Sequence, residues 1–209
     1  MSSLKIALIG AGGIGLASAT GGAIAYLNSG ETIVEYITKK DTTKKKQFIT
    51  LVADAHTALK NKYSSGNQNK PKKGNKEVGK EEIINWCKEM ENTKFSKETD
   101  KDYSLINTWC FVNTSTLLEE AKRNNKTDIN GASGDTEEWK KAWDSYNTNK
   151  GTSNLTISES APDGLNNGDR NKGGPALYNW CKAQESHKMY EENFESIYKK
   201  YEKWCFASS

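Results

Sequence analysis

The longest hydrophobic pattern in the chain is an uninterrupted apolar stretch near its start. Residues 6–27 contain no charged side chain, and as a helix they would extend about 33 Å, which is enough to cross the hydrocarbon core of a bilayer. Small residues recur at every fourth position, a spacing that lets a second membrane helix approach closely. The pattern predicts a membrane anchor or signal segment over residues 1–30, with self-association through its small-residue face. Cleavage after Ala17-Ser18-Ala19, an A-x-A motif, is an alternative.

The same stretch also fits a nucleotide-binding loop. Gly10, Gly12 and Gly15 have the G-x-G-x-x-G spacing of a dinucleotide-binding turn, and Glu35 ends a later apolar run where a ribose-binding carboxylate would lie. A doubly wound fold also needs several further strands rich in Val, Ile and Leu, and the sequence after Tyr36 supplies none. A dinucleotide-binding, oxidoreductase-like protein is therefore the enzymatic alternative, and the membrane segment is favoured.

Beyond residue 30 the apolar side chains recur at intervals of three and four, the period of an amphipathic helix. Thr32 and Thr116 each precede an apolar pair, as helix N-cap residues do. The pattern predicts an all-α protein. The expected helical faces lie within residues 48–59, 83–90, 103–110, 139–146 and 177–181.

Each of the four cysteines follows a tryptophan. The two cysteines of the first half are 23 residues apart and those of the second half 24 apart, and a phenylalanine follows the later cysteine of each half. A pattern repeated in this way indicates internal duplication. We therefore predict two homologous helical units, residues 31–112 and 113–209. The repeated dipeptides are Trp86-Cys87, Trp109-Cys110, Trp180-Cys181 and Trp204-Cys205.

The spacing of the cysteines favours disulfides over a metal site. Zinc-binding cysteines usually come in pairs two to four residues apart, which this chain lacks. We expect one bridge in each unit, Cys87 with Cys110 and Cys181 with Cys205, each closing a loop worth roughly 3 kcal/mol of stability. The alternative is an intracellular helical scaffold with four reduced cysteines packed as small apolar side chains.

Disulfides persist in oxidising compartments, so they and the apolar segment predict the same location. The expected arrangement is a cell-membrane protein held by residues 6–27, with residues 31–209 outside the cell. One feature opposes it: Lys39, Lys40 and Lys44–Lys46 closely follow the apolar stretch, and basic residues in such positions usually remain cytoplasmic.

The charge balance gives little reason to expect a nucleic-acid partner. The chain has 30 Lys and Arg against 27 Asp and Glu, a net charge of +3, and only two of the basic residues are arginines, which nucleic-acid readers favour. Residues 31–80 hold 12 lysines against 5 acidic residues, which predicts a solvated face or, alternatively, a basic patch for an anionic surface. Segments 64–80 and 151–174 are rich in Gly, Asn, Ser and Lys, and we expect solvated, mobile loops there.

The sequence predicts no catalytic, cofactor-binding or metal-binding residues. Residues 74–80 match a phosphate-binding loop as far as Lys80, but Glu81 stands where a Ser or Thr should contact magnesium. His56 and His187 lack the spacing of metal ligands. The segments beginning at Asp128 and Asp163 lack the oxygen ligands and closing Glu of calcium loops.

Taken together, the Gly-rich apolar start, the helical segments ending in Trp-Cys dipeptides and the bias toward Lys and Asn resemble the large paralogous families of uncharacterised proteins in hemotropic mycoplasmas. The resemblance covers almost the whole chain. It implies a non-enzymatic surface protein that serves host-cell interaction or antigenic variation, with host surface molecules or antibodies as partners. It brings no catalytic residues and no cofactor.

Overall fold

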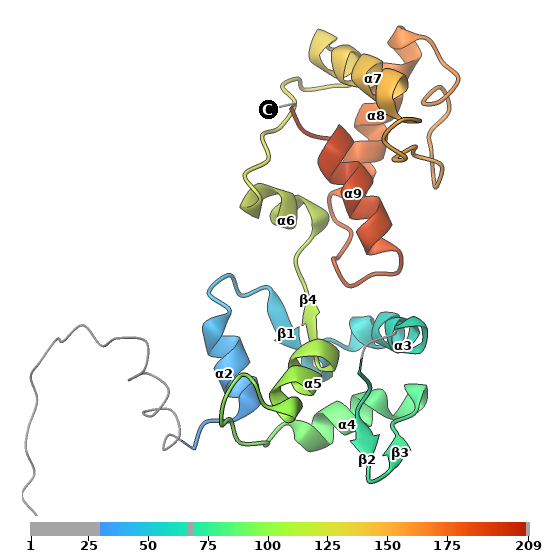
Figure 1. The fold of residues 1–209 in the computed structure, drawn as a ribbon. Helices are drawn as coiled ribbons and strands as arrows, with labels where there is room; N and C mark the ends of the chain where they lie inside the picture. The colour runs from blue at the N-terminus through green and yellow to red at the C-terminus, as the bar shows by residue number, and fades with distance from the viewer. Residues whose placement is uncertain (1–29, 67–68, 208–209) are drawn as a thin grey trace, which may run out of the picture.

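The computed structural model describes residues 30–66 and 69–207, which form two lobes, one above the other (Figure 1). This part of the chain is mostly helical, with eight α-helices and two pairs of short antiparallel strands. In residues 31–112, here called the first unit, the elements are α2 (Ile33–Lys40), β1 (Lys46–Phe48), α3 (His56–Ser65), β2 (Lys72–Lys73), β3 (Lys76–Glu77), α4 (Ile83–Met90), α5 (Lys101–Trp109) and β4 (Phe111–Asn113). In residues 113–207, the second unit, they are α6 (Leu117–Arg123), α7 (Glu137–Asn149), α8 (Arg170–Gln184) and α9 (Phe194–Trp204).

The predicted membrane segment, residues 6–27, lies outside the described residues, as do Gly10, Gly12 and Gly15. Among the helices of residues 30–66 and 69–207, none combines the length and the apolar character that a membrane crossing requires.

Each unit buries its own hydrophobic cluster. The first cluster draws its buried residues from positions 33–112, and the second from positions 117–206. In each cluster a disulfide ties the later helices together: α4 to the end of α5 in the first unit, and α8 to the end of α9 in the second. The predicted bridges Cys87–Cys110 and Cys181–Cys205 are both confirmed. The disulfides are buried, with Cys87 and Cys110 at 0% exposure.

Both predicted helix starts are confirmed, and both are capping boxes. The Thr32 hydroxyl accepts the Glu35 N–H at 3.1 Å, and the Glu35 carboxylate accepts the Thr32 N–H at 2.7 Å. Thr116 and Glu119 repeat these two bonds at the same distances. Each box satisfies two N–H groups that the first turn of a helix leaves unpaired.

The predicted helical face over residues 48–59 is wrong in its first half. This stretch begins with the end of β1, continues as two 3-10 turns (Ile49–Leu51 and Ala53–Ala55), and becomes α-helical only at His56. The cause is pairing with a distant segment: β1 pairs antiparallel with β4, and the Ile49 N–H donates to the Cys110 carbonyl at 2.8 Å. Leu51, expected on the buried face, is 76% exposed. The all-α prediction is therefore corrected to a mostly helical fold.

The two segments predicted to be solvated loops carry buried side chains. In the first, β2 and β3 form a hairpin between Pro71, which is fully buried, and Val78, which is 3% exposed. In the second, Ile157 and Leu165 are fully buried, and the last part of the segment is already helical because α8 starts at Arg170. Each segment therefore contributes buried side chains to the unit in which it lies, and the prediction of fully solvated loops is wrong for both.

Candidate functional site

In each unit, the tryptophan before the second cysteine joins the disulfide-linked helices to the segment that was expected to be a loop. This segment is 64–80 in the first unit and 151–174 in the second. In the first unit the Trp109 indole N–H donates to the Asn69 carbonyl at 2.8 Å, and its ring meets Tyr63 edge-on at 4.8 Å between centroids. In the second unit Trp204 donates to the Leu155 carbonyl at 2.9 Å and meets Tyr146 at 5.3 Å. A buried indole N–H usually pairs with an acceptor. The Trp-Cys dipeptides are thus structural elements of each core.

A second pair of matched contacts relates the start of each unit to its later part. Thr32 forms an isolated antiparallel bridge with Lys94, and Thr116 forms the same bridge with Lys188. The Ile33 N–H donates to the Thr93 carbonyl at 2.8 Å, as the Leu117 N–H does to the His187 carbonyl at 2.9 Å. These contacts place Phe95 and Met189, the residues that follow the two bridged lysines, at equivalent positions.

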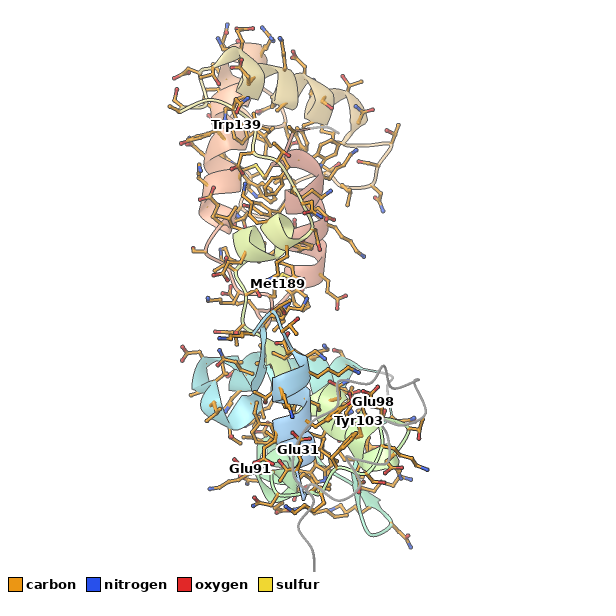
Figure 2. The ribbon with its side chains drawn as sticks, turned by 90° about the vertical axis from the view of Figure 1, so that its left-hand side faces the viewer. Glu31, Glu91, Glu98, Tyr103, Trp139 and Met189 are labelled. Atoms are coloured by element: carbon orange, nitrogen blue, oxygen red, sulfur yellow. A yellow bond between two sulfur atoms is a disulfide. The ribbon has the colours of Figure 1, made fainter. Side chains whose placement is uncertain are left out.

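The two units meet where the second unit inserts a short segment against the first. Met189 is 9% exposed, and Tyr190 packs against the hydrophobic cluster of the first unit. Figure 2 shows Met189 at the level where the two lobes join. A hollow of about 180 Å³ at this junction is lined by α3, β4 and the segment from Met189 to Phe194.

A wider groove of about 790 Å³ opens beside this junction. α3, residues 153–155 and residues 190–200 line it, so both units contribute. Its rings are Tyr190 and Phe194, and its charges have mixed sign. The basic lining residues are Lys62, Lys199 and Lys200, and the acidic ones are Glu191, Glu192 and Glu195. The groove therefore offers a surface with aromatic rings and both signs of charge, suited to binding a ligand with mixed polarity.

Lys200 on the groove wall is buried, with 7% exposure, although lysine is rarely buried without a partner. Its amine donates to the Glu159 carboxylate at 2.5 Å. This hydrogen bond lowers the pKa of Glu159 to about 2. The pair fastens α9 to the otherwise exposed part of segment 151–174.

Glu120 on α6 accepts several hydrogen bonds at the junction of the two units. This carboxylate is 8% exposed and accepts the Lys45 amine at 3.0 Å, the Asn113 amide at 3.3 Å and the Arg123 guanidinium at 3.0 Å. Burial alone would raise the pKa of Glu120, but the hydrogen bonds from Lys45 and Asn113, with the charges of Lys45 and Arg123, outweigh it and hold the pKa below its ordinary value. The ion pair with Lys45 joins the two units directly.

Replacing Glu120 with glutamine should therefore destabilise the protein by about 1–3 kcal/mol at pH 7, because charge-assisted hydrogen bonds are lost from a buried site. The lowered pKa means that Glu120 stabilises the fold above its ordinary pKa of 4.5, and that this contribution is lost as the pH falls through the folded-state value. The difference between wild type and Glu120→Gln should shrink below about pH 4. Denaturant unfolding from pH 3 to 7 measures it.

The matched control is Glu89→Gln, which removes an exposed ion pair with Lys73 and should cost less than about 0.5 kcal/mol. An equal loss in both variants, or a Glu120 effect independent of pH, would contradict this account of the junction.

The structure places the remaining sequence motifs in ordinary structural roles. The Gly79 N–H in the phosphate-loop match already donates to the Glu82 carboxylate at 3.0 Å. His56 Nε2 lies 3.0 Å from the Ile49 carbonyl, and His187 Nδ1 lies 2.6 Å from Glu191. Asp128 pairs with Lys122. Within residues 30–66 and 69–207, no three His, Cys, Asp or Glu side chains are grouped closely enough to hold a metal ion.

Sequence reasoning missed the groove and the junction. Phe95 and Met189 each lie eight residues after the first cysteine of their unit, but nothing in the sequence shows that Met189 contacts the other unit. Glu120 sits among the charged residues of α6 with no distinguishing pattern. Comparison of the chain with protein-family models, with curated proteins and with solved structures gives no match in any of the three.

Proposed function

We propose that the chain is a non-enzymatic surface protein, anchored in the cell membrane by residues 6–27, with two homologous units outside the cell that contact host molecules or antibodies. The observation that carries the proposal is the pair of buried disulfides, one in each unit. Disulfides of this kind are typical of proteins that fold in an oxidising compartment. The uncharged stretch of 22 residues supplies the means of export or attachment.

The matched contacts support two units related by duplication, with the boundary near residue 113. The capping boxes at Thr32 and Thr116, the Thr–Lys bridges, the bonds from Trp109 and Trp204 to backbone carbonyls and the disulfides recur in both units and in the same order. Repeated units that differ mainly in their connecting segments are a common architecture for display and binding, because the shared core stays constant while surface residues vary.

The surfaces available for contact differ from those that the sequence suggested. Segments 64–80 and 151–174 are anchored by buried residues, and their exposed parts include the β2–β3 hairpin and the stretch around Ser158–Ser160. The groove between the units adds Tyr190 and Phe194, and aromatic side chains are enriched at protein interfaces. We propose these three regions as the contact surface.

Labelling intact cells tests the location. A membrane-impermeant, amine-reactive reagent should modify exposed lysines such as Lys44 and Lys76 without permeabilisation. Lys200, which is 7% exposed and paired with Glu159, should remain unmodified in the folded protein and acts as an internal control. Modification of Lys44 and Lys76 only after the cells are permeabilised would reject the extracellular placement.

A further inference from the structure

The first unit carries three half-buried aromatic rings in mutual contact, Tyr36, Phe95 and Tyr103, here called the ring cluster. The Tyr36 and Phe95 rings stack with their centroids 3.8 Å apart, and the Tyr103 ring meets both edge-on, at 6.0 Å and 5.9 Å. The Tyr36 hydroxyl donates to the Glu98 carboxylate at 2.5 Å. Figure 2 shows Glu98 and Tyr103 in the lower lobe, near Glu31 in this view. The cluster therefore combines apolar rings with polar hydroxyl groups.

The ring cluster is bonded directly to the point where the chain arrives from residues 6–27. The Phe95 N–H donates to the Glu31 carbonyl at 3.0 Å, and the Lys94 amine donates to the Gly30 carbonyl. Three peptide steps separate the end of the apolar stretch from Gly30, and they span at most about 11 Å. The headgroup layer on each side of a bilayer is about 5–8 Å thick. If residues 6–27 cross the membrane as proposed, the ring cluster therefore lies beside the headgroup layer.

The equivalent face of the second unit is a contact face. Counted from the matched N-cap threonines, Tyr36 corresponds to Glu120, and the matched Thr–Lys bridges relate Phe95 to Met189. Glu120 pairs with Lys45 of the first unit, and Met189 lines the hollow at the junction. The duplication gives the first unit a corresponding face, on which rings take the place of the carboxylate and the methionine. This is the face that the chain reaches from residues 6–27.

The segments that carry the ring cluster have no net charge. Residues 31–40 and 94–103 together hold five lysines and five Asp or Glu residues. Three of the lysines form ion pairs within these segments, and the pairs are Lys39–Glu31, Lys40–Glu98 and Lys97–Asp100. A balanced surface of this kind has no preference for an anionic lipid. Tyrosine is enriched at the headgroup level of membranes because its ring is apolar and its hydroxyl is polar. Zwitterionic headgroups therefore suit this face.

We propose that the ring cluster rests in the headgroup layer of the bilayer that holds residues 6–27, and that this lipid contact fixes the direction in which the two units extend from the membrane. The inference rests on the proposed anchoring and adds a second, weaker attachment to it. The second unit, which forms the upper lobe in Figure 1, is then held away from the lipid.

The test uses the full chain in phosphatidylcholine nanodiscs, loaded at one chain per disc so that a second copy cannot cover the ring cluster. Lys97→Cys and, as a remote control, Lys141→Cys on α7 are both at exposed positions. Each variant receives a fluorophore at its new thiol, because the native cysteines are bonded to each other. A nitroxide on the lipid headgroup should quench the label at residue 97 at least twice as strongly as the label at residue 141.

A longer linker separates binding by the rings from nearness that the anchor alone imposes. Ten Gly and Ser residues inserted between Asn28 and Ser29 add about 17 Å of flexible reach, and the quenching at residue 97 should persist. In this long-linker chain Phe95→Ser should reduce the quenching at least twofold. Phe194→Ser removes a half-buried ring from the second unit and should leave the quenching unchanged. Hydrogen exchange over α2 and α5 checks that the Phe95→Ser variant remains folded.

Three results would overturn the inference and leave the anchoring intact. The first is equal quenching at residues 97 and 141 in chains that remain in the discs. The second is loss of the quenching in the long-linker chain, since the anchor alone would then hold the first unit near the lipid. The third is an equal effect of Phe95→Ser and Phe194→Ser. A full chain that does not stay with the discs would contradict the anchoring itself, and this inference with it.

Discussion

Replacing Gly173 with alanine should destabilise the second unit by about 3 kcal/mol, because α7 and α8 touch at this residue and leave no room for a methyl group. A Cβ at position 173 would lie 2.0 Å from Cε2 and 2.3 Å from Nε1 of Trp143. The ring cannot move aside easily, since Trp143 is 5% exposed and its indole N–H donates to the Leu165 carbonyl at 2.8 Å. Shifting Trp143 would break this bond or open a void in the core.

Urea unfolding of the full chain measures the effect, and hydrogen exchange analysed by mass spectrometry shows which unit loses protection. Gly151→Ala is the matched control, because a Cβ there meets nothing within 4 Å. We expect loss of protection in the second unit for Gly173→Ala and almost none for Gly151→Ala. If the two alanine variants are equally stable, the close packing of α7 on α8 is not as described.

Removing the first disulfide by the double change Cys87→Ala and Cys110→Ala should cost about 3 kcal/mol of unfolding free energy. The bridge closes a loop with a sequence separation of 23 residues, and a cross-link of this length restricts the unfolded chain by roughly that amount. Both sulfurs are also buried, so their removal takes away packing contacts. The same measurement, denaturant unfolding under non-reducing conditions, applies to the Cys181–Cys205 pair.

Because each unit has its own hydrophobic cluster, the loss should be confined mainly to the unit that carries the change. Hydrogen exchange should show lost protection over α4 and α5 in the first double variant and over α8 and α9 in the second. Equal loss in both units from either variant would show that the two clusters unfold as a single cooperative body.

The sequence predicts the parts of this fold that depend on local residue patterns and on the internal repeat. The capping boxes at Thr32 and Thr116 follow from a Thr three residues before a Glu, and both form. Helix α7 follows from Trp139, Trp143 and Tyr146, which all lie on its buried face. The disulfide pairing follows from the repeated Trp-Cys spacing, because duplication makes one bridge per unit the consistent solution.

The parts that could not be predicted depend on contacts between distant residues. β1 and β4 are three residues each, too short for an alternating pattern, and only their mutual pairing distinguishes them from helix ends. Ile157 and Leu165 lie in a segment whose composition is that of a loop, yet Leu165 accepts the Trp143 N–H in the core. A single apolar residue in a polar segment does not reveal whether another element will cover it.

The candidate site also combines residues that the sequence reveals with contacts between distant residues that it does not reveal. The lysines of segment 31–80 were visible in the sequence, but their partners were not. Lys40 pairs with Glu98, Lys45 with Glu120 and Lys60 with Glu81. These pairs come from later parts of the chain and reduce the basic character that the sequence suggested for this stretch. The groove arises only when the two units are placed together.

The claim on which the account depends is that both units fold with oxidised cysteines outside the cell. Peptide mapping of the protein, isolated from its native membrane with free thiols blocked and without reduction, tests it most directly. The account predicts two linked peptide pairs, Cys87 with Cys110 and Cys181 with Cys205, together with a first residue that retains segment 6–27 or follows its cleavage. Blocked, unlinked thiols at all four cysteines would contradict it and would favour an intracellular helical scaffold.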